Sequence, residues 1–165
     1  MEPMTATLTS TGSTAAVIVT HQRAELLRAS LAQVVHQTHP VQWVVVVDNG
    51  AEDAVRELVE SMAGDRGVYV PSETNLGGAG GFALGFLTAL SLGADAVWCA
   101  DDDGRPADHA VLAELYRVAE ANRLHEVSPA VCNIDDPGRL AFPLRQGLVW
   151  RRRMDELEGD FLPGI

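Results

Sequence analysis

Four short apolar runs alternate with helix-like segments along the first hundred residues, and each run gives way at once to polar residues or glycine. The runs occupy residues 15–20, 43–47, 67–70 and 96–100. After the first of them, Leu27, Leu31 and Val34 repeat at helical spacing. Strands separated by helices of this length predict right-handed crossovers and a parallel sheet. We therefore expect an α/β fold, with a mostly parallel sheet and helices on both of its faces.

Apolar spacing and breaker residues also predict where the helices lie. They are expected over residues 23–37, 54–62, from the glycine-rich segment to near Gly93, and 108–122. A further strand is expected over 127–134, and beyond it the periodicity is lost among prolines and glycines.

The composition of the two ends sets the expected domain boundaries. Residues 1–14 are rich in Ser, Thr and Gly, which predicts a disordered lead-in. An α/β domain should then occupy 15–134, and residues 135–165 should form a separate region.

The chain is acidic, with a net charge of −11, and it contains no lysine. An acidic chain has no general attraction for nucleic acid, so we expect no nucleic-acid partner. Without lysine, a P-loop and a Schiff-base enzyme are both excluded. A phosphate ligand would therefore be held by a metal ion, by backbone N–H groups or by single arginines.

The cysteines and the length of the apolar stretches indicate in which cellular compartment the protein is expected. Cys99 and Cys132 lie in strand-like runs without metal or redox spacing, and both are expected to be buried thiols. No apolar stretch reaches the length of a membrane span, and the N-terminus lacks a signal-peptide pattern. The expected compartment is the cytoplasm.

Four polar or glycine-rich segments follow the expected strands. They are Thr20–Arg23, Asp48–Gly50, Asn75–Gly81 and Asp101–Gly104. The carboxyl ends of parallel strands open on one edge of a sheet, and ligands bind there. These segments should therefore form one site.

Asp101, Asp102 and Asp103 form an acidic run directly after the fourth strand. Adjacent carboxylates repel one another, and a hard divalent cation such as Mg²⁺ or Mn²⁺ would compensate them. In an extended segment Asp101 and Asp103 share a side, while Asp102 points elsewhere. The alternative is an acidic cluster that favours the dipole of the next helix.

Glycines 77, 78, 80 and 81 open the third helix, where a ligand or another backbone could approach closely. The segment fits the pattern G-x-G-x-x-A, but the dinucleotide fingerprint follows the first strand and this one follows the third. An NAD site is therefore disfavoured. The alternative is that small residues let this helix lie close to the sheet.

For two single residues, Asp48 and Arg23, both a ligand-binding role and an ordinary structural role are possible from the sequence. Asp48 could accept a hydrogen bond from a base or ribose, or it could cap the following helix. Arg23 could contact a base or phosphate, or it could be an ordinary solvated residue.

Taken in order, four segments resemble the donor-binding half of the inverting glycosyltransferases of family 2, which have the Rossmann-like GT-A fold. The segments are Val17–Arg23, Val45–Asn49, Asn75–Phe82 and Trp98–Gly104. Within that family they resemble the galactofuranosyltransferases of cell-wall galactan synthesis. Residues 126–137 and 148–153 resemble those that add the first galactofuranose units.

The resemblance implies UDP-galactofuranose as donor and Mn²⁺ or Mg²⁺ as cofactor. The implied acceptor is a lipid-linked rhamnosyl-N-acetylglucosaminyl diphosphate, so peripheral contact with the inner face of the plasma membrane is expected. The implied metal ligands are Asp101 and Asp103. The implied donor-binding residues are Thr20, Arg23, Asp48, Asn49, Asn75, Gly77, Gly78, Asp101 and Asp102, with Arg23, Asn49 and Asn75 at the uridine.

In this family the catalytic base comes from a region farther along the chain than Ile165. We therefore expect no catalytic residue here, and we expect residues 135–165 to be the truncated start of an acceptor-side region. The alternative function is a non-catalytic UDP-sugar-binding module, or a subunit that needs a partner chain.

Overall fold

The chain forms two units in the computed structural model, which describes residues 7–159. The first unit comprises Met1–His125 and the second Glu126–Ile165. The boundary lies nine residues before the one expected after Ile134. Each unit is described by itself below.

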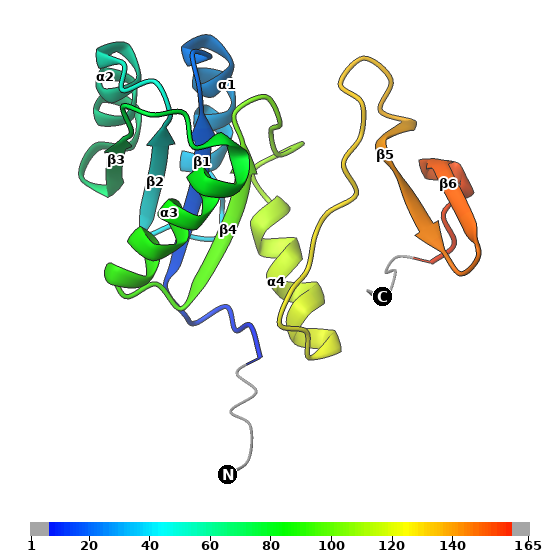
Figure 1. Cartoon of the computed structure of the whole chain (residues 1–165). Coiled ribbons are helices and arrows are strands. Elements are labelled where there is room, and N and C mark those ends of the chain that lie inside the picture. Colours follow the sequence, from blue (N-terminus) through cyan, green and yellow to red (C-terminus); the bar gives the residue numbers. More distant parts are fainter. Residues whose placement is uncertain (1–6, 160–165) are drawn as a thin grey trace. The chain divides into compact units, whose positions relative to one another are not determined.

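The first unit is built on a four-stranded sheet. Its strands are β1 (Thr14–Thr20), β2 (Trp43–Asp48), β3 (Gly67–Pro71) and β4 (Ala96–Asp101). They lie in the order β3-β2-β1-β4, and every pairing is parallel (Figure 1). The predicted parallel α/β sheet is confirmed, with each strand within one residue of its expected position.

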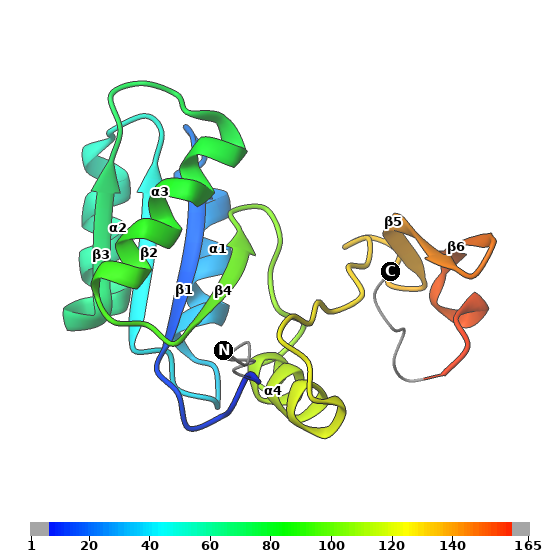
Figure 2. The same cartoon turned by 60° about the horizontal axis from the view of Figure 1, so that its bottom comes forward.

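Helices cover both faces of this sheet (Figures 1 and 2). The helices α1 (Ala24–Val35), α2 (Asp53–Ala63) and α4 (Val111–Asn122) pack on one face, and α3 (Gly77–Ser91) packs on the other. A 3₁₀ turn, η1 (Gly64–Arg66), joins α2 to β3. The expected helices on both faces are confirmed, although α4 begins three residues later than expected.

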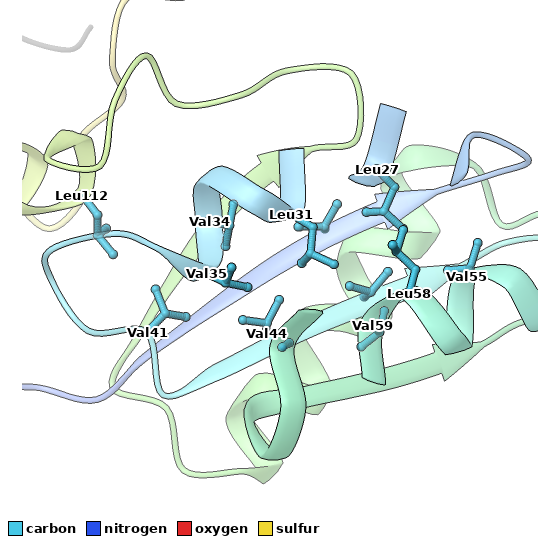
Figure 3. Close-up of a cluster of buried hydrophobic side chains, with 14 of the residues drawn as sticks. Leu27, Leu31, Val34, Val35, Val41, Val44, Val55, Leu58, Val59 and Leu112 are labelled. Atoms are coloured by element: carbon cyan, nitrogen blue, oxygen red, sulfur yellow. The ribbon is translucent and has the colours of Figure 1, made fainter. Parts of the chain in front are cut away.

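Strand alternation explains the two cores. Ala16, Ile18, Val44 and Val46 point toward α1, α2 and α4. In that core Leu27, Leu31 and Val59 fill the space between helix and sheet, as Figure 3 shows. The alternate residues Ala15, Val17, Val45 and Val47 point toward α3. Because the central strands are apolar on both faces, their sequences are continuous valine-rich runs and do not alternate with polar residues.

Two glycines let α3 lie unusually close to the sheet. A Cβ at Gly85 would stand 2.3 Å from Cγ1 of Val17, and one at Gly81 would stand 2.5 Å from Cγ1 of Val19. A Cβ at Gly78, by contrast, would meet nothing within 4 Å. The packing alternative therefore holds for Gly81 and Gly85, while Gly78 stays open to solvent.

We expect Gly85→Ala to lower the free energy of unfolding by about 1–3 kcal/mol, because the added methyl group must displace Val17. Gly78→Ala is the matched control. It should leave stability unchanged or raise it by up to about 1 kcal/mol, since alanine favours helix over glycine. Urea unfolding of both variants checks this, and equal stability of the two would contradict the close approach of α3.

A buried histidine links α4 to the loop before β2. His39 is 9% exposed, and its ring stacks on Tyr116 with the centroids 4.2 Å apart. Burial lowers the pKa of His39 below its ordinary value of 6.5, and the negative charge of Glu120 opposes this in part. The neutral ring is therefore the form that the fold favours.

Stability should consequently fall as the pH drops through the ordinary histidine range, because the unfolded chain then binds a proton that the folded chain resists. His39→Phe keeps the ring stacked on Tyr116 and removes this titration. Urea midpoints measured between about pH 7.5 and about pH 5.5 should fall less steeply in the variant than in the wild type. Identical slopes would show that His39 does not resist protonation.

The lead-in was expected to be disordered, and for residues 7–13 this is wrong. The backbone N–H of Leu8 donates to the carbonyl of Leu124, and Ser10 donates to the carboxylate of Glu120. Ser13 donates to the carboxylate of Asp95 through both its N–H and its hydroxyl. Polar residues thus hold this segment where apolar ones are few. Residues 1–6 lie outside the described part of the chain.

The second unit contains an antiparallel hairpin of β5 (Arg139–Gln146) and β6 (Val149–Arg153), followed by a 3₁₀ turn, η2 (Met154–Glu156). The strand expected over 127–134 is wrong, since that segment makes only an isolated bridge between Cys132 and Leu140 within the described residues. Pro129 interrupts it, and most of its side chains are exposed.

Exposure differs from expectation at both cysteines. Cys132 is half-buried, and Cys99 is exposed because β4 is an edge strand. Within residues 7–159, none of the helices has the length and apolar character needed to cross a bilayer.

Candidate functional site

The carboxyl ends of β1, β2 and β4 meet at one edge of the sheet. Thr20 pairs with Asp48, and Val19 pairs with Asp101. The chain stays joined beyond the strands, because the N–H of Asn49 donates to the carbonyl of Thr20 at 2.9 Å. The strand-end residues predicted to form one site are therefore neighbours in space.

Asp102 links the segment that follows β4 to the segment that follows β1. It is 7% exposed, and its Oδ2 accepts from Oγ1 of Thr20 at 2.9 Å. Nη1 of Arg23 lies 3.4 Å from Oδ1 of Asp102 and 3.0 Å from Oδ2 of Asp103. Arg23 is therefore engaged with the aspartates, and its half-exposed position makes the ion pairs modest in energy.

The hydroxyl of Thr20 should matter more than its shape. Thr20→Val removes the donor and leaves a buried carboxylate oxygen without it, so we expect the free energy of unfolding to fall by about 1–3 kcal/mol. Thr20→Ser keeps the hydroxyl and is the control. Chemical unfolding of both variants checks this. A serine variant as unstable as the valine variant would mean that the methyl group, and not the hydrogen bond, stabilises the site.

Asp101 and Asp103 are exposed, whereas Asp102 is buried, as expected for alternate residues of an extended segment. Partial burial raises the pKa of the Asp101 carboxyl, and the negative charges of Asp103 and Asp102 raise it further. Ser30 donates to the backbone carbonyl of Asp101 at 2.7 Å and fixes the end of β4. The aspartates thus remain crowded with like charge despite Arg23.

A hard divalent cation fits this set of donors, since carboxylate oxygens are its preferred ligands. Within residues 7–159 no cluster of three or more His, Cys, Asp or Glu side chains is arranged to hold a metal. Asp101 and Asp103 can therefore provide only part of a coordination shell, and the remaining ligands would come from elsewhere.

Asp48 organises the loop after β2. It is fully buried, its Oδ1 accepts from the N–H of Gly50 at 2.9 Å, and its Oδ2 accepts from the N–H of Glu52 at 2.6 Å. The hydroxyl of Tyr69 also donates to it, and burial together with this contact raises the pKa of Tyr69 to about 12. Asp48 therefore holds the loop in front of α2 and does not cap the helix itself, whose N-cap residue is Glu52. Contact of Asp48 with a ligand stays a prediction.

Asn49 connects β2 to the start of α3. Its side chain accepts from the N–H of Leu76 and donates to the carbonyl of Gly77, both at 3.3 Å. Asn75 accepts from the N–H of Gly77 at 2.8 Å, and Gly77 has a φ of +67° that suits glycine. The segment with Asn75, Gly77 and Gly78 therefore lies beside Asn49, with Gly78 open to a ligand.

His21, which the sequence alone does not mark as a site residue, also lies at this edge, directly after Thr20. Its Nδ1 is buried and has no hydrogen-bond partner among the described residues, and the next residue, Gln22, has a φ of +57°. Oε2 of Glu52 is likewise buried and unpaired within that part of the chain. The position of His21 directly after a strand that ends in Thr20 was the signal that could have identified it.

A parallel α/β sheet whose polar strand ends share one carboxyl edge is an architecture in which ligands bind at that edge. Residues 15–164 match the glycosyl transferase family 2, and the chain belongs to that family.

Curated relatives are similar along almost the whole chain. The galactofuranosyltransferase GlfT1 of Mycolicibacterium smegmatis is 55% identical over 165 residues, which cover 96% of this chain and 54% of that protein. The galactofuranosyltransferase GlfT1 of Mycobacterium tuberculosis is 56% identical over 161 residues, with 94% and 53% covered. The chain therefore spans about half the length of these relatives.

Solved structures share the fold at lower identity. A mannosyltransferase from Pyrobaculum calidifontis, in complex with GDP-Man and Mn²⁺, matches 79% of this chain and 39% of its own, with a TM-score of 0.54 and 21% identity. TarS from S. aureus, in complex with UDP, matches 66% and 32%, with a TM-score of 0.55 and 20% identity. These likenesses confirm the expected GT-A fold.

Proposed function

We propose that the first unit binds the nucleotide-diphosphate-sugar donor of a glycosyltransferase, and that this donor is UDP-galactofuranose. The observation that carries the proposal is the meeting of Thr20, Asn49 and Asp101 at the carboxyl edge of a parallel sheet. The sequence identity to GlfT1 proteins supports galactofuranose as the sugar of the donor. The UDP and GDP-Man complexes of the solved structures support a nucleotide-diphosphate ligand.

The uridine would lie against Arg23, Asn49 and Asn75. Asn49 and Asn75 both contact Gly77, which places the two residues next to each other where one base could lie. The diphosphate would approach the start of α3, where Gly77 and Gly78 offer backbone without side chains and the helix N-terminus favours an anion. Arg23 would be shared between the ligand and Asp103, which it already contacts.

Mn²⁺ or Mg²⁺ would be held by Asp101 and Asp103, and Asp101 would also contact the ribose. When bound, such an ion supplies charge neutralisation for the departing diphosphate. Asp102 would keep Thr20 and Arg23 in position beneath the ligand through the contacts it makes with both.

Donor binding should therefore depend on a divalent metal. Calorimetry should detect UDP binding with Mg²⁺ or Mn²⁺ and should lose it with a chelator, because the acidic chain repels the diphosphate. Asp103→Asn should weaken the metal-assisted affinity by about tenfold or more.

Asp65→Asn is the control for that measurement. It makes the same change of charge on an exposed residue just before β3, at the opposite edge of the sheet. Its affinity for UDP should equal that of the wild type. Equal binding with and without metal, or a larger loss in Asp65→Asn than in Asp103→Asn, would remove the metal assignment.

The complete reaction also needs an acceptor and a base. The proposed acceptor is the lipid-linked rhamnosyl-N-acetylglucosaminyl diphosphate, and no catalytic role is proposed for any residue of this chain. A base must come within ~2.6–3.2 Å of the attacking hydroxyl. Donor binding is thus the part of the reaction that these residues support, and a binding module or subunit is the alternative.

Taken alone, the chain should bind UDP and should not transfer sugar at an enzymatic rate. Loss of general-base catalysis typically costs ~10²–10⁴-fold, and loss of acceptor positioning adds to that. A transfer assay with radiolabelled UDP-galactofuranose and the lipid-linked acceptor measures this. The full-length M. smegmatis GlfT1 is the positive control. Turnover by the chain at a rate near the control would require a base among its own residues.

We also propose a cytoplasmic protein in peripheral contact with the inner face of the plasma membrane. The hairpin of the second unit supports this, because Leu148 is 90% exposed and Trp150 is 61% exposed between arginines. Aromatic side chains flanked by arginine suit the boundary between headgroups and acyl chains.

A further inference from the structure

Helix α3 is apolar on the side that faces away from the sheet. Ala79, Ala83, Phe86, Leu87 and Leu90 are all exposed, and their spacing of three and four residues places them on one stripe. Leu87 is 66% exposed and Leu90 is 63% exposed. No charged residue occurs anywhere from Thr74 to Ala94, in a chain with a net charge of −11.

The distribution of bulk in α3 is the reverse of that in an ordinary surface helix. Its buried residues are Gly81, Gly85 and Ala89, which are small and bring the helix close to the sheet. Its larger residues, Leu87 and Leu90, point outward. A helix that is apolar all round is normally buried, so the outer stripe of α3 has the character of a covered surface.

Within the described first unit, no other helix lies over this stripe, as Figures 1 and 2 show from two directions. The helices α1, α2 and α4 all pack on the opposite face of the sheet. What covers the stripe must therefore come from outside the first unit.

We propose that the outer stripe of α3 is the docking surface for the additional polypeptide that the GlfT1 relatives carry beyond the half matched by this chain. The relatives are about twice as long as the matched region, so they contain a second stretch of polypeptide of similar length. That polypeptide needs a surface to pack against. An uncharged stripe suits an apolar protein surface. It offers no basic side chain to an anionic bilayer, and two copies of this acidic chain repel each other.

The proposal concerns a face of α3 on the side of the sheet away from Asp102, and it does not depend on nucleotide binding. Hydroxyl-radical footprinting tests it, because it reads the accessibility of leucine and phenylalanine side chains one by one. Leu26, on α1 and 48% exposed, is the matched exposed control, and the fully buried Leu31 reports folding.

Two proteins are compared, namely this chain and a chimera of M. smegmatis GlfT1 in which this chain replaces the matched half. In the chain alone, Leu87 and Leu90 should be labelled about as fast as Leu26. In the chimera their labelling should fall about five- to tenfold, while that of Leu26 should not change. If labelling of Leu31 shows that the chimera is unfolded, full-length M. smegmatis GlfT1 is footprinted over the segment aligned with α3, with protection expected there.

Four results would overturn the proposal. Leu87 and Leu90 could remain as reactive as Leu26 in the longer protein. They could already be protected in the chain alone at low concentration, which would mean that the second unit covers them. Protection that grows with concentration would indicate a second copy, and protection that needs lipid vesicles would indicate a bilayer.

Discussion

The parallel pairing of β1 with β2 on one side and with β4 on the other is the constraint on which the site depends. The pairing aligns Thr20 with Asp48 and Val19 with Asp101. A slip of one residue would turn every buried valine of a strand to the opposite face, and both faces are covered by helices. A shifted strand would also lose the close fit of Gly85 on Val17. The register brings the polar strand ends together.

The four aspartates of the site fall into two groups, one buried and hydrogen-bonded and the other exposed. Asp102 is buried and satisfied by Thr20 and Arg23, and Asp48 is buried and satisfied by backbone N–H groups of its own loop. Asp101 and Asp103 stay exposed to solvent. The partial burial of the Asp101 carboxyl and the charges of Asp103 and Asp102 raise the pKa of Asp101. The first pair holds the loops in place, while the second pair leaves charge at the surface that a cation would compensate. This separation of roles follows from the alternation of side chains in an extended segment.

The strands and the shared edge could be predicted because two strong signals agreed, namely a continuous apolar run and an abrupt polar end. Which individual residues face the site and which face the sheet was harder to predict. The glycines of α3 look alike in sequence, yet Gly85 faces Val17 and Gly78 faces open space, and only the helical phase relative to the sheet separates them. The lead-in was mispredicted because hydrogen bonds from Ser10 and Ser13 replace apolar contacts. Residues 127–134 have the composition of a strand. Within the described chain, however, they pair with a neighbouring strand only at the single bridge between Cys132 and Leu140.

The central claim is that the strand ends form one donor site, and NMR of the ¹⁵N-labelled chain titrated with UDP and Mg²⁺ tests it residue by residue. The account predicts that the largest amide shifts fall in four segments, namely 20–23, 48–50, 75–78 and 101–104. It also predicts that Ser13, Gly67 and Asp95, at or near the amino ends of the strands, do not move. Shifts confined to the amino edge or to the β5–β6 hairpin, or no saturable shifts in the presence of metal, would contradict it.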